Sequence, residues 1–145
     1  MSVVGPRLRK MHLESTFTVT HFTPAGVTPP DPVGTAVSIG VATLGKQFVG
    51  DVVGRSSTLF TSAFDPGRGE GTYLAIESFE GTVGGRGGTF AFVHAASTHG
   101  DDRFDEHFAL VPGSGTGALA GITGSGALWV DADGTHRLHL DCELE

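Results

Sequence analysis

Glu77 and His94 are the two residues of this sequence whose types and surroundings best suit acid–base chemistry. Each lies in a segment with the character of a β-strand, beside the aromatic residues Phe79 and Phe92. A carboxylate facing an imidazole in an apolar cavity can fix the tautomer of the imidazole and raise its basicity, which makes a general acid–base pair. The same pair could instead be a buried ion pair that satisfies itself and holds the strand register. The sequence is compatible with both roles, the catalytic pair and the structural ion pair.

The glycine-rich segment between these two residues predicts a β-hairpin. We expect a two-residue type II′ turn at Gly85-Arg86, because its first central position needs a positive φ, which glycine adopts freely. This register places Glu77 opposite His94, with facing Cβ atoms about 4.5–5.5 Å apart. A three-residue loop would place the two side chains on opposite faces of the sheet. The first register is favoured because it gathers the aromatic residues of both strands on one face.

Three more residues could add to such a site. Glu106 shares a predicted strand face with Phe104 and Phe108, so it is a second candidate acid if that face lines the cavity, and a solvated residue if it does not. Tyr73 and Trp129 each combine an aromatic ring with a hydrogen-bond donor, which suits a pocket wall as well as a core position. The predicted catalytic residues are Glu77, His94 and Glu106. The predicted substrate-binding residues are Tyr73, Phe79, Phe92, Phe108, Trp129 and His21.

The remaining histidines and the single cysteine do not predict a metal or redox site. His136 and His139 fall on opposite faces of the strand they share, because successive side chains alternate, and no H-x-H or HExxH pair lies beside a third ligand on one strand. The lone Cys142 excludes an intrachain disulfide and a cysteine-based zinc cage. Ser114, in a GSGTG loop, lacks both the lysine of a phosphate loop and the strand–turn–helix context of a nucleophile elbow. We therefore expect no metal and no cofactor.

The composition predicts one all-β domain. The chain has 145 residues, 23 of them glycine, spaced at turn-like intervals between segments rich in Thr, Val and Phe. Glycine at this density breaks helices and supplies turns and bulges. Alternating residues predict a first strand over residues 11–22, with Phe17 and His21 on the same face, and a turn is expected at Gly45-Lys46.

Successive hairpins favour an antiparallel up-and-down barrel of about eight strands, because closure removes exposed sheet edges. Such a barrel encloses enough room for side chains or one small ligand. Small residues at expected inward positions, such as Ala75 and Ala96, would leave space for a ligand. We expect a flexible N-terminal extension over residues 1–10 and a single barrel domain with a lipophilic interior over residues 11–145.

The charge and hydropathy of the chain exclude several partners. With 16 acidic and 9 basic residues, the net charge of −7 does not suit a general nucleic-acid binder. No apolar run approaches the roughly 20 residues of a membrane span, and no signal-peptide core is present. We expect a cytoplasmic protein without membrane or nucleic-acid partners. The apolar outer positions Leu74, Ile76 and Val93 would allow a homodimer.

Three segments carry recognisable motifs: FVGDVVG at residues 48–54, ESFEGTVGGRGGTFAFVH at 77–94, and VPGSGTGALAG at 111–121. Together they resemble the bacterial domain-of-unknown-function family 3224, over nearly the whole chain from about Met11 to Glu145. Members known structurally are similar to the allene oxide cyclase barrel, so the resemblance implies a small closed β-barrel. The family has no general assigned activity, so the resemblance implies a fold more than a function.

In this resemblance, Glu77 and His94 occupy positions where the family motif also has Glu and His. The sequence departs from the pattern at Ala118, where an acidic residue is frequent, and at Thr123 and Ser125, where charged residues are frequent. It also lacks the tryptophans that the family commonly has near His21 and Phe108. The resemblance therefore does not imply a ligand shared with the relatives.

These observations lead to one functional expectation and two alternatives. We expect a cofactor-free cyclase or isomerase that binds a hydrophobic small molecule, such as a natural-product intermediate, inside the barrel and acts mainly by positioning it and excluding water. This rests in part on analogy with allene-oxide-cyclase-like barrels. The alternatives are a non-catalytic carrier or sensor of an apolar small molecule, and an interaction module with a fully packed interior.

Overall fold

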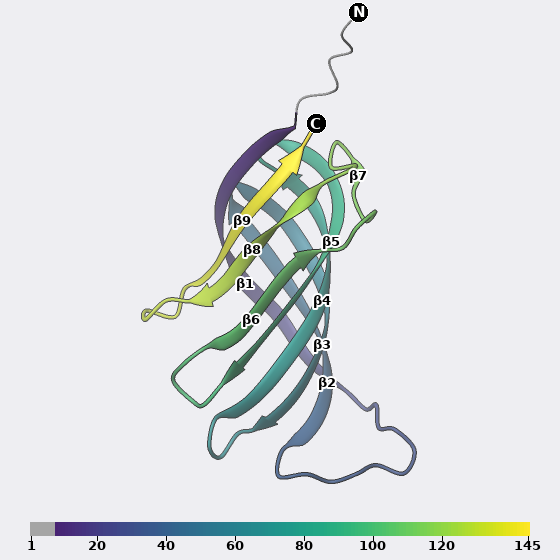
Figure 1. Cartoon of the computed structure of the whole chain (residues 1–145), viewed down its shortest axis with the longest axis vertical. Helices are drawn as coiled ribbons and strands as arrows, with labels where there is room; N and C mark the ends of the chain where they lie inside the picture. Colours follow the sequence, from purple (N-terminus) through teal and green to yellow (C-terminus); the bar gives the residue numbers. More distant parts are fainter. Residues whose placement is uncertain (1–7) are drawn as a thin grey trace, which may run out of the picture.

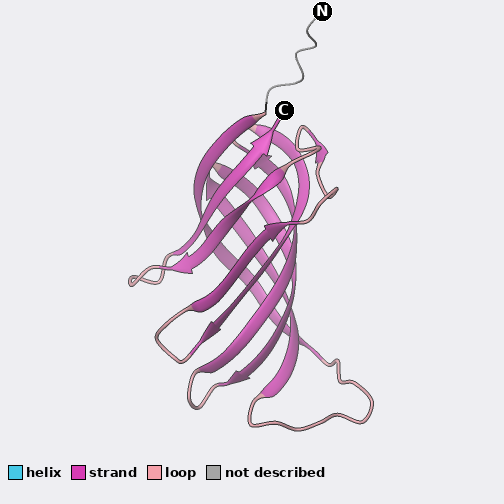
Figure 2. Ribbon diagram, in the orientation of Figure 1, coloured by secondary structure: helices cyan, strands magenta, loops and turns pink. Residues whose placement is uncertain are grey.

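Nine β-strands make up the regular structure of the chain in a computed structural model, which describes residues 8–145 (Figure 1). The strands are β1 (Arg9–Ala25), β2 (Ser38–Gly50), β3 (Val52–Asp65), β4 (Glu70–Val83), β5 (Arg86–Thr98), β6 (Phe104–Leu110), β7 (Thr116–Gly117), β8 (Thr123–Val130) and β9 (His136–Leu144). No helix occurs within the described residues, so none there is long and apolar enough to cross a membrane (Figure 2). The expected extension over residues 1–10 lies mostly outside the described residues, and β1 already begins at Arg9.

The strands form one antiparallel sheet in the order β6-β5-β4-β3-β2-β1-β9-β8, and the short β7 pairs with β5. The two edge strands, β6 and β8, approach each other and nearly close the sheet into an eight-strand barrel (Figure 1). The predicted all-β barrel is therefore confirmed. The remaining gap between β6 and β8 is a seam in its wall.

The two ends of the barrel differ because the strands differ in length. Strands β1 to β5 have 13–17 residues, whereas β6, β8 and β9 have 7–9. The longer strands extend beyond the shorter ones at the end opposite the chain termini (Figure 2). The other end is filled by a core of alternate inward residues, which includes Phe48, Val52, Phe79, Val83, Phe90, Phe92, Leu119, Leu140 and Leu144. The barrel is thus packed at one end and open at the other.

The central hairpin has a different turn from the predicted one. Gly84 and Gly85 are its two central residues, with φ of 56° and 82°, as a type I′ turn requires. The turn therefore precedes Arg86, and Glu77 pairs with Phe92 instead of His94. The register differs from the prediction by two residues. Because the side-chain period is also two, the glutamate and the histidine still share the inward face.

Two bulges change which side chains point inward. In β1 the register shifts between Val19 and His21, so His21 lies over Gly45 on the outer face instead of sharing the face of Phe17. Phe22 takes the inward position and contacts Phe60 at a ring distance of 5.8 Å. The expected alternation of β1 is wrong beyond this bulge.

In β6 the shift lies next to Asp105, which has a φ of 50°. Phe104 consequently stacks on His99 outside the barrel, while Phe108 pairs with His94. Of the outer apolar positions expected on β4, Leu74 is 50% exposed and Ile76 is 48% exposed.

Candidate functional site

Glu77 is the centre of a buried polar cluster halfway along the barrel. Its Oε1 accepts hydrogen bonds from Lys46 Nζ and from His94 Nε2, the latter at 3.1 Å. Glu77 has no exposed surface, and Lys46 and His94 are 5% and 4% exposed. The three residues come from β2, β4 and β5, and alternation along each strand directs all three inward. Glu77 and His94 are diagonal neighbours across the central hairpin.

The cluster continues toward the open end of the barrel. Tyr73 lies four residues before Glu77 on β4 and on the same face of the strand. Its hydroxyl is 2.8 Å from His94 Nδ1. Arg103 Nη2 donates to the same hydroxyl at 2.9 Å, and Arg103 Nε pairs with Glu106. A continuous polar network therefore runs from Lys46 in the core to Glu106 at the rim.

The hydrogen bonds assign a protonation state to this network. When His94 is neutral and donates Nε2–H to the Glu77 carboxylate, its Nδ1 is an acceptor. The Tyr73 hydroxyl can then donate to Nδ1 while its oxygen accepts from Arg103. Each group has the role its chemistry allows. The arrangement places a hydroxyl, an imidazole and a carboxylate in line, as in hydrolase triads.

Burial and charge determine the pKa values of the network. Burial alone would raise the pKa of the Glu77 carboxyl, but the hydrogen bond from His94 and the charge of Lys46 outweigh it and hold that pKa below its usual value. Burial lowers the pKa of His94, and its hydrogen bond to Glu77 offsets only part of this. Burial raises the pKa of the Tyr73 hydroxyl, against the hydrogen bond from Arg103. At neutral pH the carboxylate is therefore charged and the imidazole and phenol are neutral.

A pocket of about 210 Å³ opens beside this network. Lys46, Tyr73, His94 and Arg103 form its polar side. The rest of its wall is mostly apolar and comes from Phe17, Val19, Leu44, Thr58, Phe60, Leu128, Trp129, Val130 and His136. Within residues 8–145 no carboxylate lines this pocket, because Glu77 is fully buried behind its wall. Two cationic side chains and several aromatic rings therefore face one small hollow.

Two further hollows adjoin this pocket. One of about 330 Å³ lies between the long strands and shares Phe60 and Tyr73 with it. The other, of about 140 Å³, lies at the seam and includes His94, Glu106 and residues of β8. A larger hollow of about 420 Å³ around Arg55 and Ser114 touches none of the network residues. The polar network is thus reached from the open end and from the seam.

The structure unites only part of the predicted residue set. Glu77, His94 and Tyr73 are in direct or shared contact. Glu106 joins them through Arg103 and lines the seam hollow, not the pocket beside Tyr73. The other predicted residues lie in different parts of the barrel. Trp129 lines the pocket, and Phe108 lines the seam hollow. Phe79 and Phe92 belong to the packed core, and His21 lies on the outer face.

Sequence reasoning missed Lys46 and Arg103. The expected turn at Gly45-Lys46 is wrong, because β2 runs through it to Gly50. The alternation of Leu44, Lys46 and Phe48 was the signal that could have placed the lysine inward. Arg103 precedes β6, and the sequence around it carries no comparable signal.

Fold and site together define a class of protein: an antiparallel β-barrel, packed at one end, with a pocket and a buried ionic network toward the other. A family model described as "Protein of unknown function (DUF3224)" matches residues 13–142, and the chain belongs to this family.

A crystal structure of a protein with unknown function from the DUF3224 family, from Shewanella oneidensis MR-1, is similar to the chain. It is 28% identical, has a TM-score of 0.77, and the match covers 94% of this chain and 99% of that one. No curated protein matches the chain. The resemblance to the family is therefore confirmed, and the likeness to allene oxide cyclase stays a prediction.

Proposed function

We propose that this protein is a cofactor-free cyclase or isomerase that moves a proton on a small, largely apolar molecule held in the pocket beside Tyr73. The observation that carries the proposal is the line of contacts from the Tyr73 hydroxyl to His94 and on to Glu77. A phenol at a pocket wall, backed by a neutral imidazole and a buried carboxylate, is an arrangement suited to general acid–base catalysis.

The proton relay balances without a co-reactant. As a substrate C–H bond gives its proton to the Tyr73 oxygen, the phenol proton passes to His94 Nδ1, and the C–H electron pair shifts within the substrate. The Glu77 carboxylate stabilises the imidazolium so formed, and Arg103 holds the tyrosine oxygen. The reverse movement returns a proton to another substrate atom. Ring closure in the same pocket would rely on the shape imposed on the substrate.

The pocket lining indicates the class of substrate. Its apolar wall suits a hydrocarbon chain or ring, and Lys46 and Arg103 suit a carbonyl or carboxylate oxygen. The adjoining hollow of about 330 Å³ has room for an apolar tail. We therefore propose an apolar enone or unsaturated carboxylic acid as substrate.

The test is turnover of a panel of apolar enones and polyene carboxylic acids, followed by mass spectrometry of the products. Tyr73→Phe and His94→Ala should each lower kcat/KM by about 100-fold or more, because general acid–base catalysis contributes that much. Phe104→Leu, on the outer face, is the matched control and should leave turnover unchanged. Turnover that survives Tyr73→Phe would rule out the relay.

A carrier or sensor is the second candidate, favoured by the mostly apolar pocket wall and by the position of Glu77 beneath it. In that case the same compounds would bind without conversion. Binding of a carboxylic acid should weaken about tenfold in Arg103→Gln, while its methyl ester should be affected less.

A further inference from the structure

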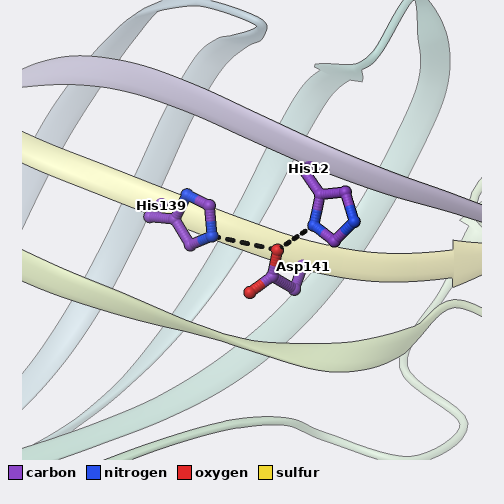
Figure 3. Close-up of side chains that lie close together, drawn as sticks. All are labelled: His12, His139 and Asp141. Carbon is purple, nitrogen blue, oxygen red and sulfur yellow. Dashed lines mark hydrogen bonds and ion pairs between the residues drawn. The ribbon is translucent and has the colours of Figure 1, made fainter.

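A second cluster of chemistry-bearing side chains lies on the outer face of the barrel, where the first and last strands of the chain, β1 and β9, pair. In this ladder His12 of β1 is directly opposite Asp141 of β9, and Glu14 is directly opposite His139. Figure 3 shows the two imidazoles on either side of the Asp141 carboxylate. Asp141 Oδ1 contacts His12 Nδ1 and lies 2.9 Å from His139 Nε2.

The geometry of this cluster fits a metal ion. One ligand atom from each of His12, His139 and Asp141 lies within 4.8 Å of the other two. An ion about 2.0–2.2 Å from each nitrogen and oxygen needs its ligands at roughly such separations. Two imidazoles and one carboxylate form a donor set that suits divalent transition metals and leaves other positions for water.

A fourth side chain supports one of the ligands. Glu14 Oε1 lies 3.8 Å from His139 Nδ1, whereas Asp141 is beside Nε2 of the same ring. A carboxylate near Nδ1 favours the tautomer that carries its proton there, which leaves Nε2 free for a metal. Carboxylates near the outer nitrogen of metal-binding histidines commonly orient the ring in this way.

We propose that His12, His139 and Asp141 form a binding site for a divalent transition-metal ion, with Zn²⁺ as the probe. The His12 and Asp141 side chains are 73% and 41% exposed, so an ion can enter and keep water ligands. A bound ion would join β1 to β9 and so link the first and last strands of the chain. This site is separate from the pocket, and the proposal does not depend on the proposed function.

Sequence reasoning did not find this site because it compared ligands along single strands. The pair His139-x-Asp141 lies on one strand face, but the second imidazole comes from the other end of the chain. Only the pairing of β1 with β9 brings His12 beside them.

The experiment is calorimetric titration of the full-length, tag-free protein with Zn²⁺ at pH 7.5, where most imidazoles are neutral. Wild type should take up one equivalent, and His12→Ala and His139→Ala should each bind at least tenfold more weakly. Asp141→Asn, which keeps the side-chain shape, should also weaken binding. His99→Ala is the matched control: His99 is an exposed imidazole that pairs with Asp102 at 2.8 Å, but it belongs to no group of three possible ligands among the residues that the structure describes.

A second measurement separates binding from a merely structural effect of the variants. Saturating Zn²⁺ should raise the Tm of wild type and of His99→Ala by on the order of 5 °C, since the ion binds only the paired strands. It should not raise the Tm of His12→Ala. The proposal is overturned if wild type takes up no stoichiometric Zn²⁺, or if His99→Ala loses as much binding as His12→Ala.

Discussion

At the scale of single residues, the stability of the protein depends on the hydrogen bonds and charges that surround the buried Glu77 carboxylate. Its Oε1 accepts from Lys46 and His94, while Oε2 and the hydroxyl of the facing Thr58 are buried without a hydrogen-bond partner among the described residues. A carboxylate so placed relies on a few partners to offset the loss of water. The network is therefore sensitive to removal of any one charge.

Glu77→Gln should destabilise the protein by about 3–5 kcal/mol, because it leaves the buried Lys46 ammonium without its counter-charge. Urea unfolding measures this free energy. The double variant Lys46→Met/Glu77→Gln removes both charges and should recover part of the loss. Equal stability of the single variant and wild type would show that the ion pair is not needed for folding.

The pH dependence of stability follows from His94 and Glu77. Both have pKa values lowered by folding, so the unfolded chain binds their protons more tightly than the native state does. Their contribution is present at neutral pH, and for His94 it is lost as the pH falls below about 6.5. The stability difference between wild type and His94→Gln should therefore shrink between pH 7 and pH 5. A constant difference over this range would contradict the lowered pKa of His94.

At the scale of elements, close backbone approaches shape the hairpins that carry the network. Gly54 and Gly81 face each other in the β3–β4 pair, with φ of 152° and 149°. A Cβ on Gly81 would lie 2.1 Å from the backbone oxygen of Val53. The two strands therefore come together here more closely than side chains allow, which suits the curvature of a closing sheet.

Gly81→Ala should cost about 3 kcal/mol, because it adds both a backbone clash and an unfavourable φ. Gly85→Ala is the matched control: its φ is also positive, but its Cβ would meet open space, so only about 1 kcal/mol is expected. Chemical denaturation of the two variants measures the comparison. Similar losses for both would mean that the close approach relaxes at no cost.

At the scale of the whole molecule, the barrel divides stability and binding between its two ends. Phe92 is 1% exposed in the packed core, whereas Phe64, at the open end, is 39% exposed and lines the hollow of about 330 Å³. The packed end can hold the strands in place while the open end remains free for a ligand. Unequal strand lengths produce this division.

Phe92→Ala should destabilise the protein by about 3–5 kcal/mol, the usual range for a large core truncation. Phe64→Ala should cost less than about 1.5 kcal/mol, because its side chain is only partly buried. Urea unfolding of both variants tests this. If Phe64→Ala were as costly as Phe92→Ala, the open end would be part of the structural core.

The sequence was sufficient to predict the all-β class, the barrel, and the placement of Glu77 and His94 on one face of the sheet. These depend on local patterns: alternation along each strand, glycines at turns, and a side-chain period of two that survives a register shift of two. The sequence alone did not predict that the side chains of His21 and Phe104 point outward. In each strand a single bulge inverts the alternation of side chains, and such a bulge leaves no clear signal in the composition.

By itself, then, the sequence determined which residues of each strand face inward wherever the strand is regular, because side-chain direction is a local property of the backbone. Only the tertiary structure decided which side chains from different parts of the chain meet, inside the barrel or on its outer face. Lys46 reaches Glu77 across β3, Arg103 meets Tyr73 across β5, and His12 joins His139 because the two ends of the chain pair. Such contacts depend on barrel closure and strand offset, which arise from the packing of the whole chain.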